Sequence, residues 1–346
     1  MRAAVFEAVG RLAMVERPGP RPPEGAVRVR VDACGICGTD VHIFRGEFPG
    51  AAFPLVAGHE FAGVVEATGA GVSHLRPGDQ VAVDPNIYCG VCRPCRRGLG
   101  HLCRNLTALG VNMDGGFATH CVVPARQAYK VGPVLPLHVA AMAEPVSCCV
   151  HGIERAGIRP GDCVVILGAG MIGLIMLQLA LFQGAACAIV SEPGPEKRAM
   201  AAQLGATQTI DPRTQGLADV VAQATGGEGA DCVIECVGAE STAHQAVSLA
   251  GEAGRVLFFG VAPPAARISI SPYDIYRREI TLTGSFTNPR TFDAALALLS
   301  SGRLRVAELI SHRVPLEKVA EGIELLESRR AMKVMVEPQT NQSRAS

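Results

Sequence analysis

The sequence contains no Trp, only 4% aromatic residues and no net charge, with 32 Lys and Arg against 32 Asp and Glu. Proteins that bind single-stranded nucleic acid stack bases on aromatic side chains, so this scarcity argues against that class. The balance of charges also gives no basic field for a phosphate backbone. We therefore expect no nucleic-acid partner, and a small molecule as the ligand.

The sequence also predicts no signal peptide and no membrane-spanning helix. The first ten residues, MRAAVFEAVG, contain no extended apolar run, so they predict no secretory signal peptide. Residues 163–191 carry no charge and are long enough to span a bilayer, but the glycines of GAGMIG divide them into a strand, a turn and a helix. We therefore expect a cytoplasmic protein with no membrane partner, whose 13 cysteines are thiols and in part metal ligands.

The first part of the chain has the pattern of a β-rich domain. Residues 27–31, VRVRV, alternate as a half-buried strand does, and residues 61–67 and 79–83 follow a similar pattern between glycine-rich turns. After about residue 290, the sequence predicts two amphipathic helices and a strand, KVMVEP. The length of 346 residues corresponds to about two domains.

From about residue 150, short apolar runs alternate with helical stretches. The runs are DCVVILGAG, CAIVSE, DCVIECVG and RVLFFG, and the helical stretches include MIGLIMLQLALFQ and PEKRAMAAQLGA. Continuous apolar strands that alternate with helices indicate a parallel sheet covered on both faces. The sequence therefore predicts an α/β fold with a doubly wound parallel sheet in this part.

Gly168, Gly170 and Gly173 form a G-x-G-x-x-G pattern between a predicted strand and a predicted helix. The first glycine makes the tight turn, the second admits a pyrophosphate, and the third lets the helix pack on the strand. The next strand ends in Glu192, about 20 residues on, where an acid binds the ribose hydroxyls. A carboxylate there repels a 2′-phosphate, so we expect NAD rather than NADP. Lys197 and Arg198 are close enough to the cofactor to keep NADP as the less favoured alternative, and Lys197 is a candidate cofactor contact.

Four cysteines lie close together in CGVCRPCRRGLGHLC: Cys89, Cys92, Cys95 and Cys103. Two disulfides could link them, but a cytoplasmic location argues against this. Four thiolates in so short a loop match a tetrahedral structural zinc with no open position, and His101 is then a bystander. Such a closed site stabilises the loop and performs no chemistry.

The segment CGICGTDVH holds a second cysteine pair, Cys34 and Cys37. It could be a redox pair, half of a zinc knuckle, or part of a catalytic metal site. A redox pair needs a helix N-terminus in a thioredoxin-like setting, whereas this pair follows a predicted strand in the β-rich part, far from any βαβ unit. A zinc knuckle needs a second cysteine pair, and the nearest one already belongs to the four-cysteine loop. A catalytic site needs ligands elsewhere, and the sequence offers His59 and Glu60 in AGHEFAG and Glu144 in MAEPVSC.

These motifs, in this order, resemble the zinc-containing medium-chain dehydrogenases of the alcohol and polyol dehydrogenase family, over essentially the whole chain. The resemblance implies a GroES-like catalytic domain of residues 1–150, completed by 290–346. It implies a Rossmann NAD-binding domain of residues 151–289, with the active site in the cleft between the two domains. It also implies two zinc ions per chain, one catalytic and one structural, and a homodimer or homotetramer.

By this resemblance, Cys37 and His59 are ligands of the catalytic zinc. Glu60 and Glu144 supply the acidic side of its shell, and which of them touches the metal is left open. Cys34 is then a packed, apolar residue. The resemblance also implies cofactor contacts from Ile172, Val261 and Ser285.

The implied reaction follows from an open zinc position. Zinc binds the substrate hydroxyl and lowers its pKa, and the carbon passes a hydride to the nicotinamide. Thr39 receives the proton and His42 relays it outward, while Asp40 orients the loop or a ligand histidine.

The glutamate of the AEP motif resembles the polyol branch, since the family's simple alcohol dehydrogenases carry a cysteine there. We therefore expect oxidation of a secondary hydroxyl of a sugar alcohol or a vicinal diol. Sorbitol dehydrogenases tend to carry an Arg-Tyr pair where this chain has Thr287 and Asn288, so sorbitol itself is in doubt. Phe117 is expected on the substrate side, with a place in the core as the alternative.

Two other functions remain open. An L-threonine 3-dehydrogenase has a similar CGICGTDVH, GHE and four-cysteine loop. A zinc- and NAD-binding sensor or scaffold without turnover would need none of the catalytic residues, yet all of them are present. A metal-free reductase of the quinone-reductase type would lack both metal sets.

Overall fold

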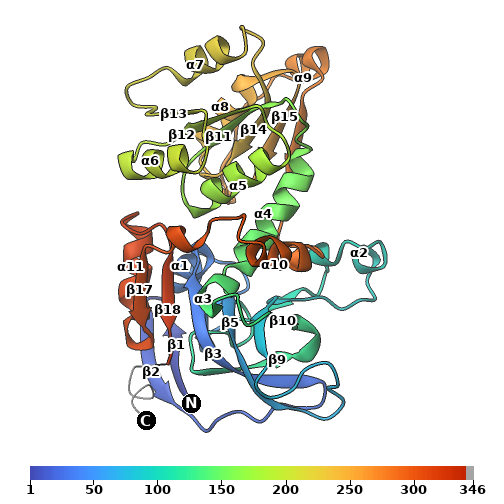
Figure 1. The fold of residues 1–346 in the computed structure, drawn as a ribbon, viewed down its shortest axis with the longest axis vertical. Coiled ribbons are helices and arrows are strands. Elements are labelled where there is room, and N and C mark those ends of the chain that lie inside the picture. Colours follow the sequence, from blue (N-terminus) through green and yellow to red (C-terminus); the bar gives the residue numbers. More distant parts are fainter. Residues whose placement is uncertain (340–346) are drawn as a thin grey trace. The chain divides into compact units, whose positions relative to one another are not determined.

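The computed structural model describes residues 1–339, and the chain divides into two compact units (Figure 1). Unit 1 consists of Met1–Ser147 and the chain from Pro289 onward, and unit 2 is Cys148–Asn288. Unit 1 is rich in strands, and unit 2 alternates strands with helices. The predicted fold class, a doubly wound α/β part with a β-rich part, is confirmed.

The described residues of unit 1 form three sheets. Its strands are β1 (Arg2–Ala8), β2 (Arg11–Glu16), β3 (Ala26–Ile36), β4 (Leu55–Val56), β5 (Glu60–Thr68), β6 (Gln80–Val83), β7 (Asn86–Ile87), β8 (Thr107–Ala108), β9 (His120–Pro124), β10 (Ala128–Lys130), β17 (His312–Pro315) and β18 (Val334–Glu337). The largest sheet has the order β10-β6-β5-β3-β18-β17, and β9 also pairs with β3. The other two are β2-β1-β4 and β7-β8.

Strand β3 organises the largest sheet because it pairs with β5, β9 and β18. Its valines at 27, 29 and 31 are fully buried, and Arg28 and Arg30 between them are partly exposed. This is the alternation that a half-buried strand requires. The ends of β3 and the start of β5 meet in register, with Gly35 opposite Glu60.

Short helices connect these strands. They are α1 (Gly38–Arg45), α2 (Arg93–Arg96), α3 (Leu137–Ala140), α10 (Phe292–Ser300) and α11 (Val319–Glu327), with single 3₁₀ turns η1 (Gly100–Leu102), η2 (Ala125–Gln127), η3 (Ala307–Leu309) and η4 (Leu316–Lys318). A further helix, α4 (Ala143–Ala156), contains the boundary between the two units. The two amphipathic helices predicted after residue 290 are α10 and α11.

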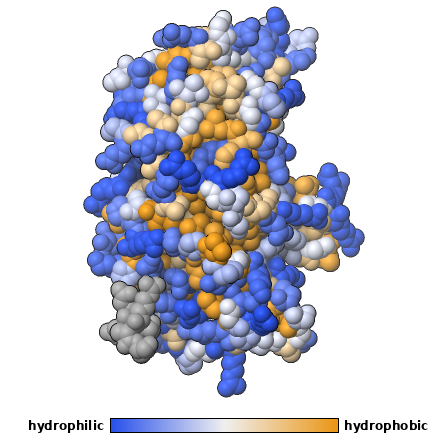
Figure 2. Space-filling model, in the orientation of Figure 1, coloured by the Kyte–Doolittle hydropathy of each residue, from blue (hydrophilic) through white to orange (hydrophobic). Residues whose placement is uncertain are grey.

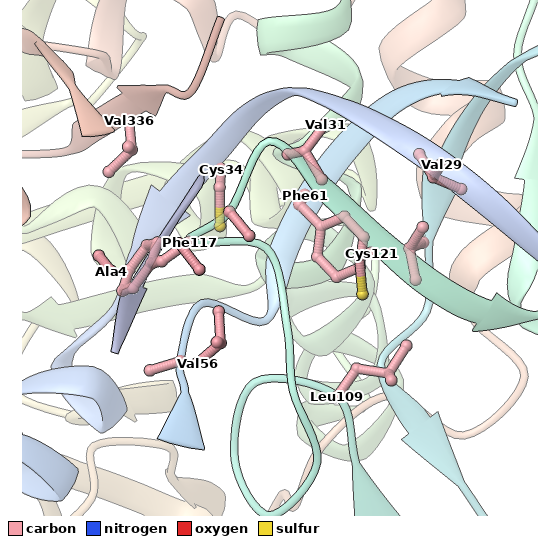
Figure 3. Packing of buried hydrophobic residues seen from close by; sticks show 14 of the residues in the cluster. Ala4, Val29, Val31, Cys34, Val56, Phe61, Leu109, Phe117, Cys121 and Val336 are labelled. Atoms are coloured by element: carbon pink, nitrogen blue, oxygen red, sulfur yellow. The ribbon is translucent and has the colours of Figure 1, made fainter. Parts of the chain in front are cut away.

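The core of unit 1 is formed by apolar side chains from several of these strands (Figure 3). Cys34 belongs to it and has no exposed surface, as expected of a packed cysteine. Phe117 is also fully buried in this cluster, close to Phe6. The expectation that Phe117 lines the substrate side is therefore wrong, because its ring fills the core.

Unit 2 contains one parallel sheet (Figure 1). Its strands are β11 (Cys163–Leu167), β12 (Cys187–Ser191), β13 (Gln208–Ile210), β14 (Ala230–Glu235), β15 (Ala250–Phe258) and β16 (Thr281–Gly284), and its helices are α5 (Met171–Phe182), α6 (Pro195–Gln203), α7 (Leu217–Ala224), α8 (Glu240–Leu249) and α9 (Pro272–Arg278). The order is β13-β12-β11-β14-β15-β16, with every pairing parallel. This is the Rossmann order, 3-2-1-4-5-6.

The uncharged stretch of residues 163–191 forms β11, α5 and β12 of this sheet. All five residues of β11 are buried, as a central strand covered on both faces requires. Within residues 1–339, none of the helices combines the length and the apolar character needed to cross a membrane. Figure 2 shows hydrophilic side chains over much of the visible face of each unit, with apolar side chains between them.

Candidate functional site

The structure brings Cys37, His59 and Glu60 together in unit 1. Their possible ligand atoms all lie within 4.8 Å of one another. Cys37 follows β3 and is the N-cap of α1, while His59 and Glu60 stand at the start of β5. Because β3 and β5 are antiparallel neighbours, the end of one lies beside the start of the other. The sheet itself therefore assembles this cluster from two distant motifs.

Asp40 holds the two loops of the cluster in place. Its side chain is fully buried. Oδ2 accepts a hydrogen bond from Cys37 N at 2.8 Å, and Oδ1 accepts one from Gly58 N at 3.1 Å. Oδ1 also lies 3.6 Å from His59 Nδ1. Burial disfavours the charged imidazole, but Asp40 and Cys37 outweigh it and raise the pKa of His59 well above its ordinary value.

Lys333, just before β18, is a member of this site that the sequence analysis missed. Its side chain has no exposed surface. Nζ donates to Glu60 Oε2 and, at 3.0 Å, to Ile36 O. Burial opposes its charge, but Glu60 outweighs burial and raises the pKa of Lys333. The lysine is therefore a buried cation in contact with the candidate metal cluster.

The cluster has the donor set of a zinc site. Thiolate, imidazole and carboxylate are the ligands that Zn²⁺ takes in proteins, and three of them leave a fourth position open. Glu60 Oε1 is buried and has no hydrogen-bond partner within the described part of the chain. A buried carboxylate oxygen without a partner is costly. A cation at this position would satisfy it, so the residues present fit a zinc ion.

Three other predicted catalytic residues lie outside this group of three. Glu144 is buried in the first turn of α4, and within residues 1–339 it is not grouped with Cys37, His59 and Glu60. Thr39 and His42 lie three positions apart on α1, and therefore on one helix face. The His42 side chain is 49% exposed, and its Nδ1 lies 2.9 Å from Glu47 Oε2.

The four-cysteine loop forms a second cluster in unit 1. The Sγ atoms of Cys89, Cys92, Cys95 and Cys103 come together, with separations of 3.4–3.8 Å between Cys92 and Cys95, Cys92 and Cys103, and Cys103 and Cys89. Backbone N–H groups point at the sulfurs, and those of Cys95 and Arg104 lower the pKa of Cys92 to about 6. A thiolate is the form that binds zinc, so this loop also fits the metal. His101 is not a member of the group.

The glycine motif of unit 2 has the expected turn geometry. Gly168 has φ of +95°, a conformation that side chains disfavour. A Cβ atom on Gly173 would lie 1.9 Å from Gly168 O, whereas one on Gly170 would meet nothing within 4 Å. Gly170 is the N-cap of α5. The motif therefore leaves an open approach to the start of a helix, as a pyrophosphate site requires.

Glu192 stands at the end of β12 beside this turn and is 8% exposed. Its Oε2 accepts from Ala169 N at 2.9 Å, and Oε1 accepts from Gly194 N at 2.9 Å. The carboxylate therefore links the glycine turn, through Ala169 N, to the segment that follows β12, through Gly194 N. Lys197 and Ile172, at the starts of α6 and α5, are partly exposed.

Two arginines lie beside Glu192, and only the first of them, Arg198, was named from the sequence. Arg198 Nη1 donates to Glu192 O at 2.7 Å, and Arg213 Nη2 donates to Pro193 O at 2.5 Å. Both also pair with Asp211, at 3.2 and 2.7 Å. Their cationic groups therefore lie at the end of the strand where Glu192 is found.

The remaining predicted cofactor contacts lie after β15 and β16. Val261 is 83% exposed. Ser285 is partly buried, and its Oγ has no hydrogen-bond partner within the described residues. Thr287 has φ of +52°, which is unusual for a β-branched residue, and its Oγ1 also lacks a partner there.

Models of known protein families match parts of both units. Residues 23–133 match the alcohol dehydrogenase GroES-like domain, and residues 172–301 match the zinc-binding dehydrogenase domain. D-altritol 5-dehydrogenase from Agrobacterium fabrum is 38% identical, covering 92% of this chain and 94% of its own. D-arabinitol dehydrogenase 1 from Uromyces fabae is 33% identical, covering 98% and 97%. L-threonine 3-dehydrogenase from Pyrococcus abyssi is 35% identical, covering 93% and 94%.

Solved structures similar to this chain are also dehydrogenases. A zinc-binding dehydrogenase from Sinorhizobium meliloti 1021, bound to NADP, is 39% identical with a TM-score of 0.94, covering 97% of this chain and 99% of its own. An alcohol dehydrogenase from Escherichia coli CFT073, in complex with NADH, is 33% identical with a TM-score of 0.91 and the same coverage. The chain therefore belongs to the zinc-containing medium-chain alcohol dehydrogenase family, in its polyol dehydrogenase branch, and is an oxidoreductase.

Proposed function

We propose that this enzyme oxidises a secondary hydroxyl of a sugar alcohol or vicinal diol, with NAD as the hydride acceptor and a catalytic zinc. The observation that carries this proposal is the cluster of Cys37, His59 and Glu60, whose ligand atoms lie within 4.8 Å of one another. The relatives named for D-altritol and D-arabinitol support the substrate class.

Each residue of the cluster has a distinct part in this proposal. Cys37, His59 and Glu60 hold the catalytic metal, and Glu144 supplies a further acidic group. A zinc ion in this place supplies a Lewis acid that lowers the pKa of a substrate hydroxyl. Asp40 fixes the loops that carry the ligands, through its bonds to Cys37 N and Gly58 N.

We assign the proton path to α1. The Thr39 hydroxyl accepts the proton that leaves the substrate hydroxyl, and the His42 imidazole passes it to solvent. The two side chains share one helix face, and His42 is 49% exposed. Glu47, 2.9 Å from His42 Nδ1, holds that ring in one orientation. In this proposal the other ring nitrogen, Nε2, transfers the proton.

NAD is the proposed cofactor, bound at the glycine turn through Gly168, Gly170, Ile172 and Gly173. The Glu192 carboxylate beside the turn favours ribose hydroxyls over a 2′-phosphate. Lys197, Val261 and Ser285 are proposed as further contacts. Arg198 and Arg213 lie at the same strand end, where their cationic groups can attract a 2′-phosphate, so NADP is kept as the weaker alternative. One solved relative is bound to NADP and another to NADH.

Purified, zinc-loaded protein tests the substrate class directly. NADH formation is measured with sugar alcohols, vicinal diols, simple secondary alcohols and L-threonine, each with NAD and with NADP. A strong rate with one polyol and NAD supports the proposal. A rate with L-threonine alone would favour the activity of the Pyrococcus abyssi relative, and no turnover with zinc and NAD bound would favour a sensor or scaffold.

Replacing a proposed zinc ligand provides a second test. We predict that Cys37→Ser and His59→Ala each lower kcat by at least about 1,000-fold, because zinc-bound Lewis-acid catalysis supplies several kcal/mol. NADH binding, followed by fluorescence titration, should stay within about threefold of wild type because the glycine turn lies in unit 2. A variant with near-normal kcat would rule out the assignment of this cluster as the catalytic centre.

We also propose a cytoplasmic location and a homodimeric or homotetrameric assembly. None of the 13 cysteines, all of which lie in the described part of the chain, forms a disulfide, which suits a reducing compartment. The assembly is the one that the resemblance to the family implies. Light scattering coupled to size-exclusion chromatography measures the subunit number.

A further inference from the structure

Lys333 contacts both sides of the candidate catalytic cluster. Its ammonium group donates to Glu60 Oε2, on a proposed ligand, and to Ile36 O, in the residue before Cys37. The side chain is fully buried, and a Cβ atom on Gly35 would lie within 2.9 Å of Lys333 Nζ. The structure therefore packs a cation tightly against the place where a second cation is proposed to bind.

As a result, only one of the two carboxylate oxygens of Glu60 has a hydrogen-bond partner among the described residues. Oε2 is committed to Lys333, while Oε1 is buried and has no hydrogen-bond partner in the described part of the chain. A carboxylate can bind zinc through one oxygen or through both. With Oε2 occupied by the lysine, only Oε1 is available.

We propose that Lys333 is a positioning residue that restricts Glu60 to single-oxygen contact with the catalytic metal, and so keeps one coordination position open for substrate. This inference rests on the proposed zinc site at Cys37, His59 and Glu60. An ammonium group close to the metal also repels it, so the same residue weakens zinc binding and prevents the shell from closing.

A purely structural lysine would act differently. The pairing of β18 with β3 is already made by the backbone, with Val334 opposite Ile36. If Nζ only stabilised the fold around the ligands, its loss would loosen Cys37 and Glu60, and zinc would dissociate faster. If it restricts Glu60, its loss frees Oε2 for the metal, and zinc would dissociate more slowly. The two roles therefore predict opposite signs.

The test compares zinc release from wild type, Lys333→Met and Lys333→Arg holoenzymes into a chromogenic chelator. Loss of a group that contacts a metal ligand typically lowers metal affinity by about 10–100-fold; for Lys333 we expect an effect of that size in the opposite direction, because its loss frees Glu60 Oε2 for the metal. We therefore expect Lys333→Met to release one of its two zinc ions at least about tenfold more slowly, with a lower kcat and a smaller change in KM. Lys333→Arg, which keeps the charge and donors, should stay within about threefold of wild type. Lys318→Met, at a half-exposed lysine that pairs with Glu321, is the matched control and should not alter release.

Cobalt substitution supplies a spectroscopic readout. Visible absorption by Co²⁺ weakens as the coordination number rises, so Lys333→Met should absorb less per bound ion than wild type. If Lys333→Met does not fold, Lys333→Gln removes the same charge and is measured in its place. Equal or faster zinc release with an unchanged cobalt spectrum would overturn the role of Lys333 alone. A wild-type protein that binds only one zinc, at the four cysteines, would overturn the proposed catalytic site as well.

Discussion

Asp40 has no exposed surface, and its two oxygens accept hydrogen bonds from the backbone of two separate loops, at Cys37 and Gly58. We predict that Asp40→Asn destabilises the protein by about 1–3 kcal/mol, because an amide has one acceptor oxygen and one buried N–H loses its partner. Urea denaturation measures the change. Asp32→Asn, at a partly exposed aspartate that pairs with Arg30, should cost less than about 1 kcal/mol. Equal losses in the two variants would contradict the role of Asp40.

At the same scale, Lys333 shows why part of the site could not be predicted from the sequence. Cysteine, histidine and glutamate are common zinc ligands, so a metal site at Cys37, His59 and Glu60 can be predicted from their motifs. A lysine before a strand is ordinary at a protein surface. Its burial depends on a partner, Glu60, 273 positions away in the sequence, and on the space that Gly35 leaves. Only the three-dimensional pairing of β18 with β3 brings these residues together.

At the scale of elements, strands with strong apolar patterns were predictable and short helices were not. The predicted strands at 27–31, 61–67 and 79–83 correspond to β3, β5 and β6, and the apolar runs after residue 150 to the parallel strands. Helix α1 was not predicted, because its eight residues bury only Asp40 and Ile43. Its signals are local: Asp40 accepts from the N-cap Cys37, and Gly46 ends the helix in the left-handed conformation.

The contact between β11 and α5 depends on the third glycine of the motif. We predict that Gly173→Ala costs about 1–3 kcal/mol of stability, since its Cβ would lie 1.9 Å from Gly168 O and force the elements apart. It should weaken NADH binding too. Gly170→Ala meets nothing within 4 Å and should cost less than about 1 kcal/mol, while still weakening NADH binding. Thermal unfolding and NADH fluorescence measure both effects; a Gly170→Ala variant as unstable as Gly173→Ala would contradict this account.

The four-cysteine loop has little regular structure of its own, only the short elements α2 and η1 between β7 and β8. We predict that Cys95→Ser lowers the zinc content by one ion per chain and reduces the melting temperature, because metal binding stabilises such a loop. The kcat of the folded protein should remain near wild type. Cys187→Ser, in β12, should leave the zinc content unchanged. Loss of both zinc ions in Cys95→Ser would show that the two sites are coupled.

At the scale of the whole molecule, each unit contains a carboxylate whose ion pair makes the folded protein more stable at neutral than at acidic pH. Lys130, 2.6 Å away, lowers the pKa of Asp79 in unit 1, and Arg213 lowers the pKa of Asp211 in unit 2 below its usual range. A lowered pKa in the folded state contributes stability above the unfolded value, about pH 4, and that stability is lost as the pH falls through the folded value.

We therefore predict that the free energy of unfolding declines between about pH 5 and pH 3. Urea titrations at a series of pH values measure it. Asp79→Asn should be less stable than wild type at pH 7, and the difference should shrink as the pH falls, because protonation removes the same charge. A difference that stays constant with pH would show that the ion pair contributes nothing to this dependence.

The pairing of β18 with β3 has a consequence for the timing of synthesis. The proposed ligand Cys37 directly follows β3, yet the strand that pairs there and carries Lys333 to Glu60 is made about 300 residues later. At about 5–20 residues per second, the gap is roughly 15–60 s. During that interval the Rossmann unit is complete and able to fold, while the edge of β3 and its thiol wait for the end of the chain. The nucleotide-binding unit is thus ready before the metal centre can acquire its final form.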